Sequence, residues 1–455
     1  MLFTTEWLSE LFVDFQGAAG DSIPLEQVTT DSRVETKKSL FIPLVGDNFD
    51  GHDYIKQAFD NGAVAAFWDK QKERPHFLPT DFPIFYVTDT LKALQLLASV
   101  YRDKVDPIVV GVTGSNGKTT TKDIVSAVVK TSYKTHHTIG NFNNQIGLPL
   151  TILSMPANTE MLVLEMGMNH FGEIEQLSNI AKPDYAIITN IGESHIEYLG
   201  SREGIAEAKL EILVGMKPNG QIIIDGDEKL LEKIHNNDQV ITCGFNANNN
   251  VIVSQPKVMQ EYTSFHLSDH EEYTISLLGK HNALNASFAI TLGERLGINK
   301  VEIKKALKSL KLTSMRFELV KGINGVSIIN DAYNASPTSM RASIEVVKQM
   351  KGFKQKVLVL GDIFELGNYA KELHQSVAEA IDEEIAVLFT YGEHAKEIST
   401  TVKEHQKKII SRHFDAREQL LQALQPYLSN DVLLLFKASR GMQFEKLAEK
   451  IKLPL

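Results

Sequence analysis

Hydrophobic positions in this chain form two series of short apolar runs, each run followed by residues with helical spacing. The first series begins near residue 106 and comprises PIVVGVTG, EMLVLEMG, DYAIITNIG and GQIIIDGD. The second begins near residue 314 and comprises GVSIINDAY, QKVLVLGD, IAVLFTYG and DVLLLFKASRG. Apolar runs that alternate with helical segments predict parallel strands joined by crossover helices. We therefore predict two α/β domains, over residues 106–313 and 314–455.

The first part of the chain, residues 1–105, has a different pattern. It mixes short apolar runs with turn signals, as in SLFIPLVGDNFDGH and NGAVAAFWD. We predict a small α/β domain here and find no catalytic constellation in it. The length of 455 residues agrees with three domains, because a domain usually holds roughly 100–200 residues.

Composition indicates which kinds of molecule and metal the chain can bind. The formal net charge is -10 at pH 7, which disfavours nucleic-acid binding because phosphate backbones are bound by clustered Lys and Arg. The chain shows no basic leader and no run near the roughly 18 apolar residues of a membrane span. We therefore expect a cytoplasmic protein without nucleic-acid or membrane partners. The single Cys243 leaves no thiolate cluster for zinc, so any metal must bind oxygen or imidazole ligands.

The strongest local motif is GVTGSNGKTTTKDIV, an apolar run that breaks into a glycine-rich turn and then a helix. Gly114 and Gly117 allow backbone N–H groups to turn toward phosphate oxygens. Lys118 can reach the outer phosphates and Thr119 can hold Mg²⁺. The motif therefore predicts a nucleotide site. The residues expected to bind nucleotide in this loop are Gly114, Ser115, Asn116, Gly117, Lys118, Thr119 and Thr120.

Other nucleotide-dependent functions compete with this interpretation. The usual phosphate-loop spacing would place a glycine at Val112, so the signature here is the variant T-G-x-x-G-K-T. A GTPase would need N-K-x-D, but the nearest string, residues 299–302, ends in Glu and is expected to be solvated surface. The H-R-D and D-F-G motifs of protein kinases are absent. A non-catalytic nucleotide-binding scaffold stays an alternative that steady ATP turnover would exclude.

Three further residues follow the phosphate loop in the motifs LVLEMG, TNIGESHIEYLGS and EGIAEAKLEI: Glu165, His195 and Lys209. Each alone has an ordinary structural explanation, as a strand-end carboxylate, a loop histidine and a solvated helix lysine. With Thr119 they would make an oxygen-and-nitrogen site for Mg²⁺ beside ATP. A lysine cation is not a metal ligand, so the residues alone do not explain Lys209. We expect Lys118, His195 and Lys209 to be catalytic, and for Lys209 this expectation comes only from the family resemblance that follows.

The motifs resemble, in order and spacing over nearly the whole chain, those of the Mur ligase family. They are TTDSR, DGH, TGSNGKTT, GNFNNQIGLPLT, EMGMNHFGEI, TNIGESHIEYLGS, IAEAKLEI, GKHNALNASFAI, DAYNASPTSM, LGDIFELG and KASRGMQFE. The resemblance implies an α/β fold of three domains. Residues 1–105 would bind the UDP-sugar, residues 106–313 would form a phosphate-loop ATPase with a mostly parallel sheet, and residues 314–455 would form a Rossmann-like domain that closes over the site.

The resemblance also implies an activity. The branch that it favours joins D-alanyl-D-alanine to UDP-N-acetylmuramoyl-tripeptide through an acyl phosphate, forming ADP, in peptidoglycan synthesis, and so serves cell shape and division. The cofactors would be ATP and two Mg²⁺, and the enzyme would be a monomer. Two related ligases stay open, namely the enzyme that adds the third amino acid and the folylpolyglutamate synthetases. GNFNNQIGLPLT and the missing D-N-P-R string favour the D-alanyl-D-alanine branch. The third residue of the tripeptide, lysine or diaminopimelate, also stays open.

The resemblance implies roles residue by residue. Thr119 and Glu165 would bind one Mg²⁺, and His195 with a carbamylated Lys209 would help to hold a second. Carbamylation would turn Lys209 from a cation into an oxygen ligand. The nucleotide would contact Asn282, Asn285, Arg316 and Asp331. The sugar–peptide substrates would contact Ser32, Arg33, Asn141, Asn143, Asn144, Asn334 and Arg440, and the acceptor pocket would lie near Asn334, Pro337, Asp362, Glu365 and Arg440.

Several positions depart from the family pattern and weaken the assignment of the acceptor pocket. Asp362 and Glu365 could equally be cap or turn residues after the apolar run VLVL. The departures are Met315, Asn330, Ala438 and Phe444, which stand where Gly, Asp, Gly and Met are usual.

Overall fold

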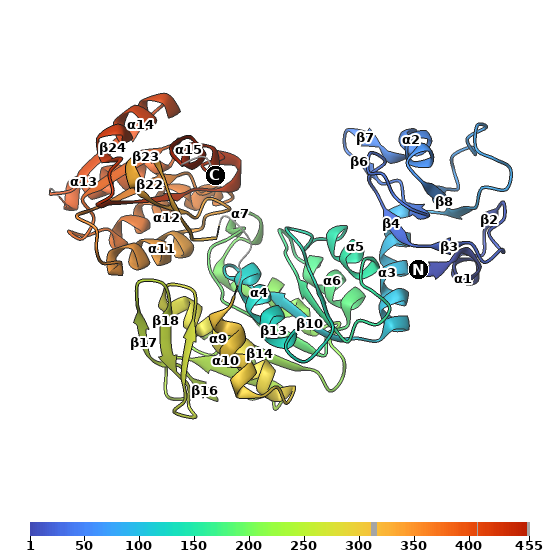
Figure 1. Cartoon of the computed structure of the whole chain (residues 1–455), viewed down its shortest axis with the longest axis horizontal. Helices are drawn as coiled ribbons and strands as arrows, with labels where there is room; N and C mark the ends of the chain where they lie inside the picture. The colour runs from blue at the N-terminus through green and yellow to red at the C-terminus, as the bar shows by residue number, and fades with distance from the viewer. Residues whose placement is uncertain (311–315, 407, 453–455) are drawn as a thin grey trace.

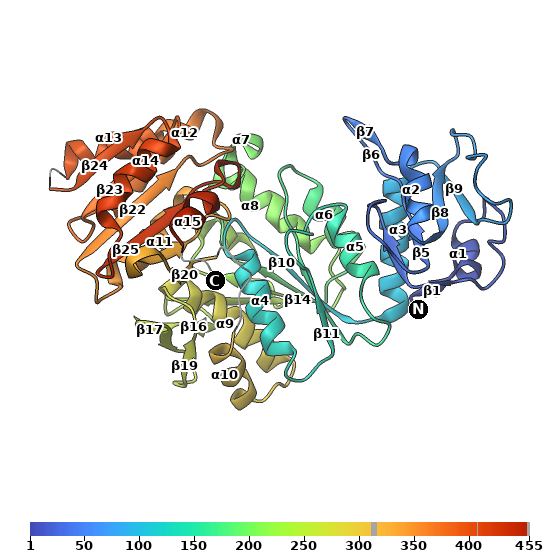
Figure 2. The same cartoon turned by 45° about the horizontal axis from the view of Figure 1, so that its top comes forward.

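The computed structural model describes residues 1–310, 316–406 and 408–452, which form three lobes (Figure 1). In both views the N-terminal and C-terminal lobes lie on opposite sides of the central lobe (Figure 2). The expected α/β class with three domains is confirmed. The expected boundary at 313/314 and Met315 lie outside the described residues, and the boundary at 105/106 stays a prediction.

The central lobe is built on a seven-stranded sheet in which all neighbouring strands are parallel. The strand order is β11-β12-β10-β13-β14-β15-β16. The strands are β10 (Ile108–Thr113), β11 (Thr135–His137), β12 (Met161–Glu165), β13 (Tyr185–Ile188), β14 (Gln221–Asp225), β15 (Val240–Gly244) and β16 (Val251–Ile252). The first series of apolar runs forms β10, β12, β13 and β14, so the expected parallel sheet is confirmed.

Successive side chains along each strand point to opposite faces of this sheet, so both faces carry apolar residues, and helices cover both. The helices are α4 (Lys118–Val129), α5 (Gly147–Leu153), α6 (Glu173–Ala181), α7 (Ile196–Leu199), α8 (Arg202–Leu210), α9 (Lys280–Arg295) and α10 (Lys300–Lys308). Val110 and Val112 pack in the core beneath α4, α9 and α10. Val109 faces the opposite core, which contains residues of α5, α6 and α8. The string at 299–302 begins α10, where Asn299 accepts a hydrogen bond from the backbone of Val301, so it is a helix cap.

A separate antiparallel sheet of three strands precedes α9. It comprises β17 (Ser254–Val258), β18 (Thr263–His266) and β19 (Glu272–Ile275). Phe265, Tyr273 and Ile275 of this sheet are buried in the same core as α9. The series of apolar runs did not predict this sheet, because its strands are short and lack a continuous apolar run.

The C-terminal lobe repeats the parallel α/β design. Its strand order is β20-β21-β25-β22-β23-β24, and only β20 is antiparallel to its neighbour. The strands are β20 (Glu318–Lys321), β21 (Ser327–Asn330), β22 (Gln355–Gly361), β23 (Val387–Tyr391), β24 (Ile410–Phe414) and β25 (Val432–Lys437). The helices are α11 (Pro337–Gln349), α12 (Ala370–Val377), α13 (Ala395–His405), α14 (Arg417–Leu424) and α15 (Glu445–Ile451). The second series of apolar runs forms β21, β22, β23 and β25, as predicted.

The N-terminal lobe has a five-stranded sheet of order β2-β9-β8-β5-β4, with β2 antiparallel to the rest. Two small antiparallel pairs, β1–β3 and β6–β7, lie beside it. The strands are β1 (Phe3–Thr4), β2 (Phe15–Gln16), β3 (Pro24–Leu25), β4 (Gln27–Thr29), β5 (Ser39–Phe41), β6 (Val45–Gly46), β7 (Phe49–Asp50), β8 (Ala63–Asp69) and β9 (Ile84–Val87). The helices are α1 (Thr5–Leu11), α2 (Ile55–Asp60) and α3 (Thr90–Val105).

Helix α3 lies between the N-terminal and central lobes. It contacts β8 on one side and α5 and α6 on the other. The Tyr101 hydroxyl donates to Met155 O at 2.9 Å, and Arg102 Nε donates to Ile180 O at 3.1 Å. Both side chains are buried, so α3 packs as one wall shared by two lobes. No helix in the described part of the chain is both long and apolar enough to span a membrane.

Candidate active site

A cavity of about 1080 Å³ lies at the carboxyl ends of the central strands and extends to the C-terminal lobe. In parallel α/β sheets, ligands collect at this edge. The cavity is lined from both lobes, by residues far apart in the sequence. Of the residues chosen from the sequence, it is lined by Ser115, Asn116, Gly117, Lys118, Thr119, Thr120, Asn141, Asn143, Asn144, Glu165, His195, Asn282, Asn285, Arg316, Asp331 and Asn334.

The phosphate loop joins β10 to α4, and two glycines permit its shape. Gly114 has φ 147°, and a Cβ there would lie 1.9 Å from Thr189 Oγ1. Gly117 has φ 79° and precedes the first residue of α4. Lys118 Nζ donates to Gly114 O at 2.7 Å, so the lysine folds back over its own loop. Desolvation lowers the pKa of Lys118, and the carboxylate of Glu165 opposes this shift.

Ser115 Oγ, Asn116 Nδ2, Arg316 Nε and Glu165 Oε2 are among the buried polar atoms around the loop that have no hydrogen-bond partner within the described ranges. A buried polar group without a partner is costly and calls for an explanation. The hydroxyl, the amide and the guanidinium can donate to an anion, whereas the carboxylate oxygen can bind a cation. The four atoms therefore fit a nucleotide phosphate with its divalent metal.

Thr119 and Glu165 supply oxygen atoms for such a metal. Arg316 Nη2 donates to Thr119 Oγ1 at 3.1 Å, and Asn143 Nδ2 donates to Glu165 Oε1 at 2.8 Å. Both residues are buried. Outside 311–315, 407 and 453–455, no group of three or more His, Cys, Asp and Glu side chains could hold a metal. A metal here would therefore need the mixed set of ligands expected from the sequence.

His195 contacts a carboxylate from the C-terminal lobe. It precedes α7 in a left-handed conformation, with φ 65°. His195 Nδ1 lies 2.6 Å from Glu365 Oε2, and this contact lowers the pKa of Glu365. A metal-binding histidine commonly pairs its second ring nitrogen with a carboxylate in this way. Glu365 lies against His195, and its expected place near the acceptor stays a prediction.

Lys209 lies on α8 and is 2% exposed. Burial lowers its pKa well below the ordinary value, and the nearby charge of Lys118 lowers it further. The alternative that Lys209 is an ordinary solvated helix lysine is therefore wrong. It is not among the residues that line the cavity. A neutral amine is the form of lysine that can react with carbon dioxide to give a carbamate.

Helix α9 places the expected nucleotide residues beside the phosphate loop. Asn282 Nδ2 donates to Leu278 O at 2.8 Å, and Asn285 Nδ2 donates to Asn282 Oδ1 at 3.2 Å. A Cβ at Gly117 would lie 3.2 Å from the Asn285 amide, so the helix and the loop are in close contact. The neighbouring His281, which we had not singled out, also lines the cavity, and burial lowers its pKa to about 4.

The C-terminal side of the cavity contains two further clusters. The Arg316 guanidinium lies 4.0 Å from the centre of the Tyr333 ring. Asp331 Oδ2 accepts from Lys437 Nζ at 2.6 Å and from Ser343 Oγ at 2.7 Å. Tyr333 and Lys437 were missed, although both lie in motifs of the family resemblance. Residue type alone does not reveal that they meet Arg316 and Asp331.

Several expected substrate residues do not line the cavity. Ser32 Oγ donates to Gln57 in the N-terminal lobe at 2.8 Å. The Arg33 side chain is 78% exposed and pairs with Asp31 at 2.7 Å, which lowers the pKa of Asp31 to about 2. Arg440 lies 5.8 Å from the Tyr333 ring centre, outside the residues that line the cavity.

Two residues assigned to the acceptor pocket have clear structural positions. Asp362 accepts backbone N–H groups of Glu393, His394 and Ala395 at 2.7–2.9 Å, where α13 begins. The alternative that Asp362 is a cap residue is therefore confirmed. Pro337 is the first residue of α11, a position that suits its fixed φ.

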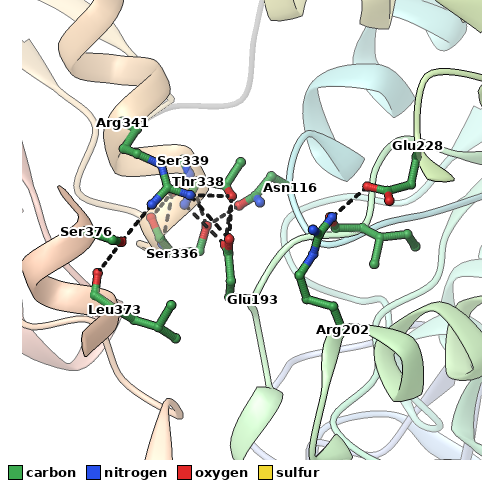
Figure 3. Close-up of polar contacts among 11 residues, drawn as sticks. Asn116, Glu193, Arg202, Glu228, Ser336, Thr338, Ser339, Arg341, Leu373 and Ser376 are labelled. Carbon is green, nitrogen blue, oxygen red and sulfur yellow. Dashed lines mark hydrogen bonds and ion pairs between the residues drawn. The ribbon is translucent and has the colours of Figure 1, made fainter. Parts of the chain in front are cut away.

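The C-terminal domain was expected to close over the site, but the side-chain pairs that join it to the central lobe were not predicted. Glu193 contacts Thr338 and Arg341, and Asn116 contacts Ser336 (Figure 3). Each pair is separated by at least 145 residues. The motifs TNIGESH and DAYNASPTSM contain most of these residues, but neither motif indicates that they meet.

Three family models match successive parts of the chain, and known proteins match most of its length. Residues 24–102 match "Mur ligase family, catalytic domain", residues 112–293 match "Mur ligase middle domain", and residues 315–440 match "Mur ligase, glutamate ligase domain". The UDP-N-acetylmuramoyl-tripeptide–D-alanyl-D-alanine ligase of Bacillus subtilis is 47% identical over 93% of this chain and 92% of its own. The Escherichia coli ligase of the same name is 32% identical over 95% of each chain.

Solved structures agree with these sequence matches. A crystal structure of MurF from Acinetobacter baumannii has a TM-score of 0.86 and 28% identity, and the match covers 98% of each chain. MurF from Thermotoga maritima in complex with ADP has a TM-score of 0.82 and 30% identity. That match covers 94% of this chain and 97% of the other.

Proposed function

This chain belongs to the Mur ligase family, and from that membership we propose that it joins D-alanyl-D-alanine to UDP-N-acetylmuramoyl-tripeptide with ATP, in peptidoglycan precursor synthesis. One observation carries the proposal. The relative from Bacillus subtilis, which is named for this reaction, matches 93% of the chain at 47% identity. The Thermotoga maritima neighbour binds ADP, which supports the use of ATP and the formation of ADP.

The reaction would have two steps. A carboxylate oxygen of the tripeptide attacks the γ-phosphorus of ATP, which forms an acyl phosphate and releases ADP. The amine of D-alanyl-D-alanine then attacks the acyl carbon, and phosphate leaves through a tetrahedral intermediate. Phosphoryl transfer depends mainly on positioning and charge neutralisation. Lys118, Ser115 and Asn116 can supply these, because they bring a cation and two unpaired donors to the phosphate loop.

The metal would be held on the same side of the loop. Thr119 Oγ1 and the unpaired Glu165 Oε2 would bind one Mg²⁺, and His195 with a carbamylated Lys209 would hold a second. Bound Mg²⁺ would neutralise phosphate charge as it develops. Glu365 would keep the His195 ring oriented. The lowered pKa of Lys209 supports the modification, since it favours the neutral amine. A carbamate signal in ¹³C NMR after exposure to labelled bicarbonate, absent in Lys209→Arg, would test it.

The substrates would approach from both outer lobes. Asn282, Asn285 and Arg316 would contact the nucleotide beside the phosphate loop. Asp331 already accepts a hydrogen bond from Lys437, so it would have to contact Lys437 and the nucleotide at the same time. The UDP-sugar would reach Ser32 and Arg33, the peptide would pass Asn141, Asn143 and Asn144, and the acceptor would lie near Asn334 and Arg440. We propose that the enzyme acts as a monomer in the cytoplasm.

Release of inorganic phosphate tests this function. Purified protein is given Mg²⁺ and ATP, with UDP-N-acetylmuramoyl-tripeptide and D-alanyl-D-alanine added singly and then together. Release that requires both substrates is the expected result. Release with folate and glutamate, or with a different amino acid as acceptor, would overturn the substrate assignment.

A further inference from the structure

The loop of residues 189–195, between β13 and α7, is bonded to the phosphate loop. Ser115 N donates to Asn190 O at 3.0 Å, and Asn116 N donates to Asn190 Oδ1 at 3.0 Å. Thr189 Oγ1 donates to Asn116 O at 2.5 Å. These bonds join backbone atoms of the phosphate loop to backbone and side-chain atoms of loop 189–195, so a displacement of one loop is transmitted to the other.

Glu193, in the same loop, points toward the C-terminal lobe (Figure 3). Its carboxylate accepts from Thr338 Oγ1 at 2.7 Å, from Thr338 N at 3.3 Å and from Arg341 Nη2 at 3.3 Å. Glu193 is only 9% exposed. Within residues 1–310, 316–406 and 408–452, every hydrogen-bond partner of its side chain belongs to the first turns of α11.

The same end of α11 also contacts the phosphate loop directly. Ser336 Oγ donates to Asn116 Oδ1 at 2.8 Å, while Ser336 also caps α11 by accepting from Ser339 N (Figure 3). Arg341 is held in place by Ser376, which accepts from Arg341 Nη1 at 2.8 Å. Contacts within the C-terminal lobe therefore hold the start of α11 in the geometry that binds Glu193.

We propose that Glu193 is a positioning residue that holds the C-terminal lobe against the phosphate loop, so that docking of this lobe and nucleotide binding are coupled. If the lobe moves away, a buried carboxylate loses all of these partners, and that state is disfavoured. Hydrogen bonds to a charged group correspond to a shift of roughly 10-fold to 100-fold in such an equilibrium. The inference rests on the proposed function only in that the phosphate loop must bind nucleotide.

Arg202 supplies a matched control because it anchors the same loop from within the central lobe. Arg202 Nη2 donates to Ile191 O at 2.8 Å and to Glu228 Oε2 at 2.7 Å (Figure 3). Neither partner belongs to the C-terminal lobe. Arg202→Met therefore removes a contact of this loop within the central lobe and leaves the contact of Glu193 with α11 in place.

Energy transfer between two dyes tests the docking. Cysteines replace the exposed Lys257 on β17 and Lys403 on α13, one in each lobe. The native Cys243 is buried, and burial raises its pKa to about 12, so it does not compete for the label. Transfer efficiency is measured in the labelled protein, in Glu193→Ala, in Glu193→Gln, in the pair Thr338→Val with Arg341→Met, and in Arg202→Met.

We expect Glu193→Ala to lower the ratio of docked to separated molecules roughly 10-fold to 100-fold. The Thr338/Arg341 pair should have the same effect, and adding Glu193→Ala to that pair should change little more. Glu193→Gln should have a smaller effect, and Arg202→Met none. Thermal unfolding identifies any variant that is not folded. Unchanged transfer efficiency in folded Glu193→Ala would overturn the proposal.

ADP affinity provides the second measurement. Because coupling is reciprocal, the factor by which ADP favours docking equals the factor by which docking favours ADP. We expect Glu193→Ala to weaken ADP binding about 10-fold, and saturating ADP to restore part of the transfer efficiency. Weaker ADP binding with unchanged docking would mean that Glu193 acts only within its own loop, which also contradicts the proposal. Absence of ligase turnover in the protein without substitutions would instead contradict the proposed function.

Discussion

The carboxyl ends of the two parallel sheets carry polar residues in opposite states. At the central sheet, Ser115 Oγ and Glu165 Oε2 are buried without partners in the part of the chain that the structure describes. At the C-terminal sheet, Asp362 accepts three backbone N–H groups, and Asp331 accepts from Lys437 and Ser343. Similar architecture therefore serves two purposes. The unsatisfied groups of the central sheet are free to bind a ligand, whereas the carboxylates of the C-terminal sheet are already bound by groups of their own lobe.

The largest effect should come from the unsatisfied edge. Lys118→Ala removes the cation of the phosphate loop, and we expect turnover to fall about 1000-fold because charge stabilisation in the transition state is lost. The thermal midpoint should change little, since among the described residues Lys118 Nζ bonds only to carbonyls of its own loop. Phosphate release and thermal unfolding measure the two quantities. Normal phosphate release would refute the role of Lys118.

The opposite edge should respond through stability. Lys437→Met leaves the Asp331 carboxylate, whose side chain is 13% exposed, without its cation, and we expect the free energy of unfolding to fall by about 3 kcal/mol. The double variant Asp331→Asn with Lys437→Met should recover part of that loss, because no unpaired charge remains. Urea denaturation without ligands provides the measurement. A loss in the double variant as large as in the single one would show that packing, not charge, explains it.

Asp225, at the end of β14, should make the free energy of unfolding depend on pH. Burial raises its pKa to about 7, above the ordinary value of 3.8. The carboxyl is protonated in both states at low pH, so stability is highest there and falls as pH rises through about 7. Asp225→Asn should abolish this dependence and gain about 2 to 4 kcal/mol over wild type at pH 8. Parallel pH profiles of the two proteins between 4 and 8 would contradict the prediction.

Asp362→Ala should have the smallest effect of these changes. The substitution removes the acceptor for three N–H groups at the start of α13, and we expect a loss of about 1.5 kcal/mol in unfolding free energy. Asp362→Asn should recover most of this loss, because its amide oxygen can still accept. Phosphate release at low temperature should change little in both variants. A selective loss of turnover would return Asp362 to the acceptor pocket.

The sequence was sufficient where a function depends on neighbouring residues. The glycines, Lys118 and Thr119 of the phosphate loop lie within one motif, and the parallel strands follow from continuous apolar runs. It was insufficient where function depends on contacts across the chain. Nothing in the spacing of Glu193 and Thr338 shows that they meet, and Asp362 and Glu365 follow the same strand in different environments. Burial, which lowers the pKa of Lys209, also depends on tertiary packing.

Helix α3 has a practical consequence for dividing this protein into fragments. A fragment that ends at residue 105 would keep the helix in sequence but remove the neighbours of Tyr101 and Arg102. One apolar face would then be exposed to water, and self-association of the fragment would be expected. A fragment that begins at residue 106 would expose the complementary surface of α5 and α6. Both fragments would therefore need to include helix α3 to stay soluble, so its sequence would have to be present twice.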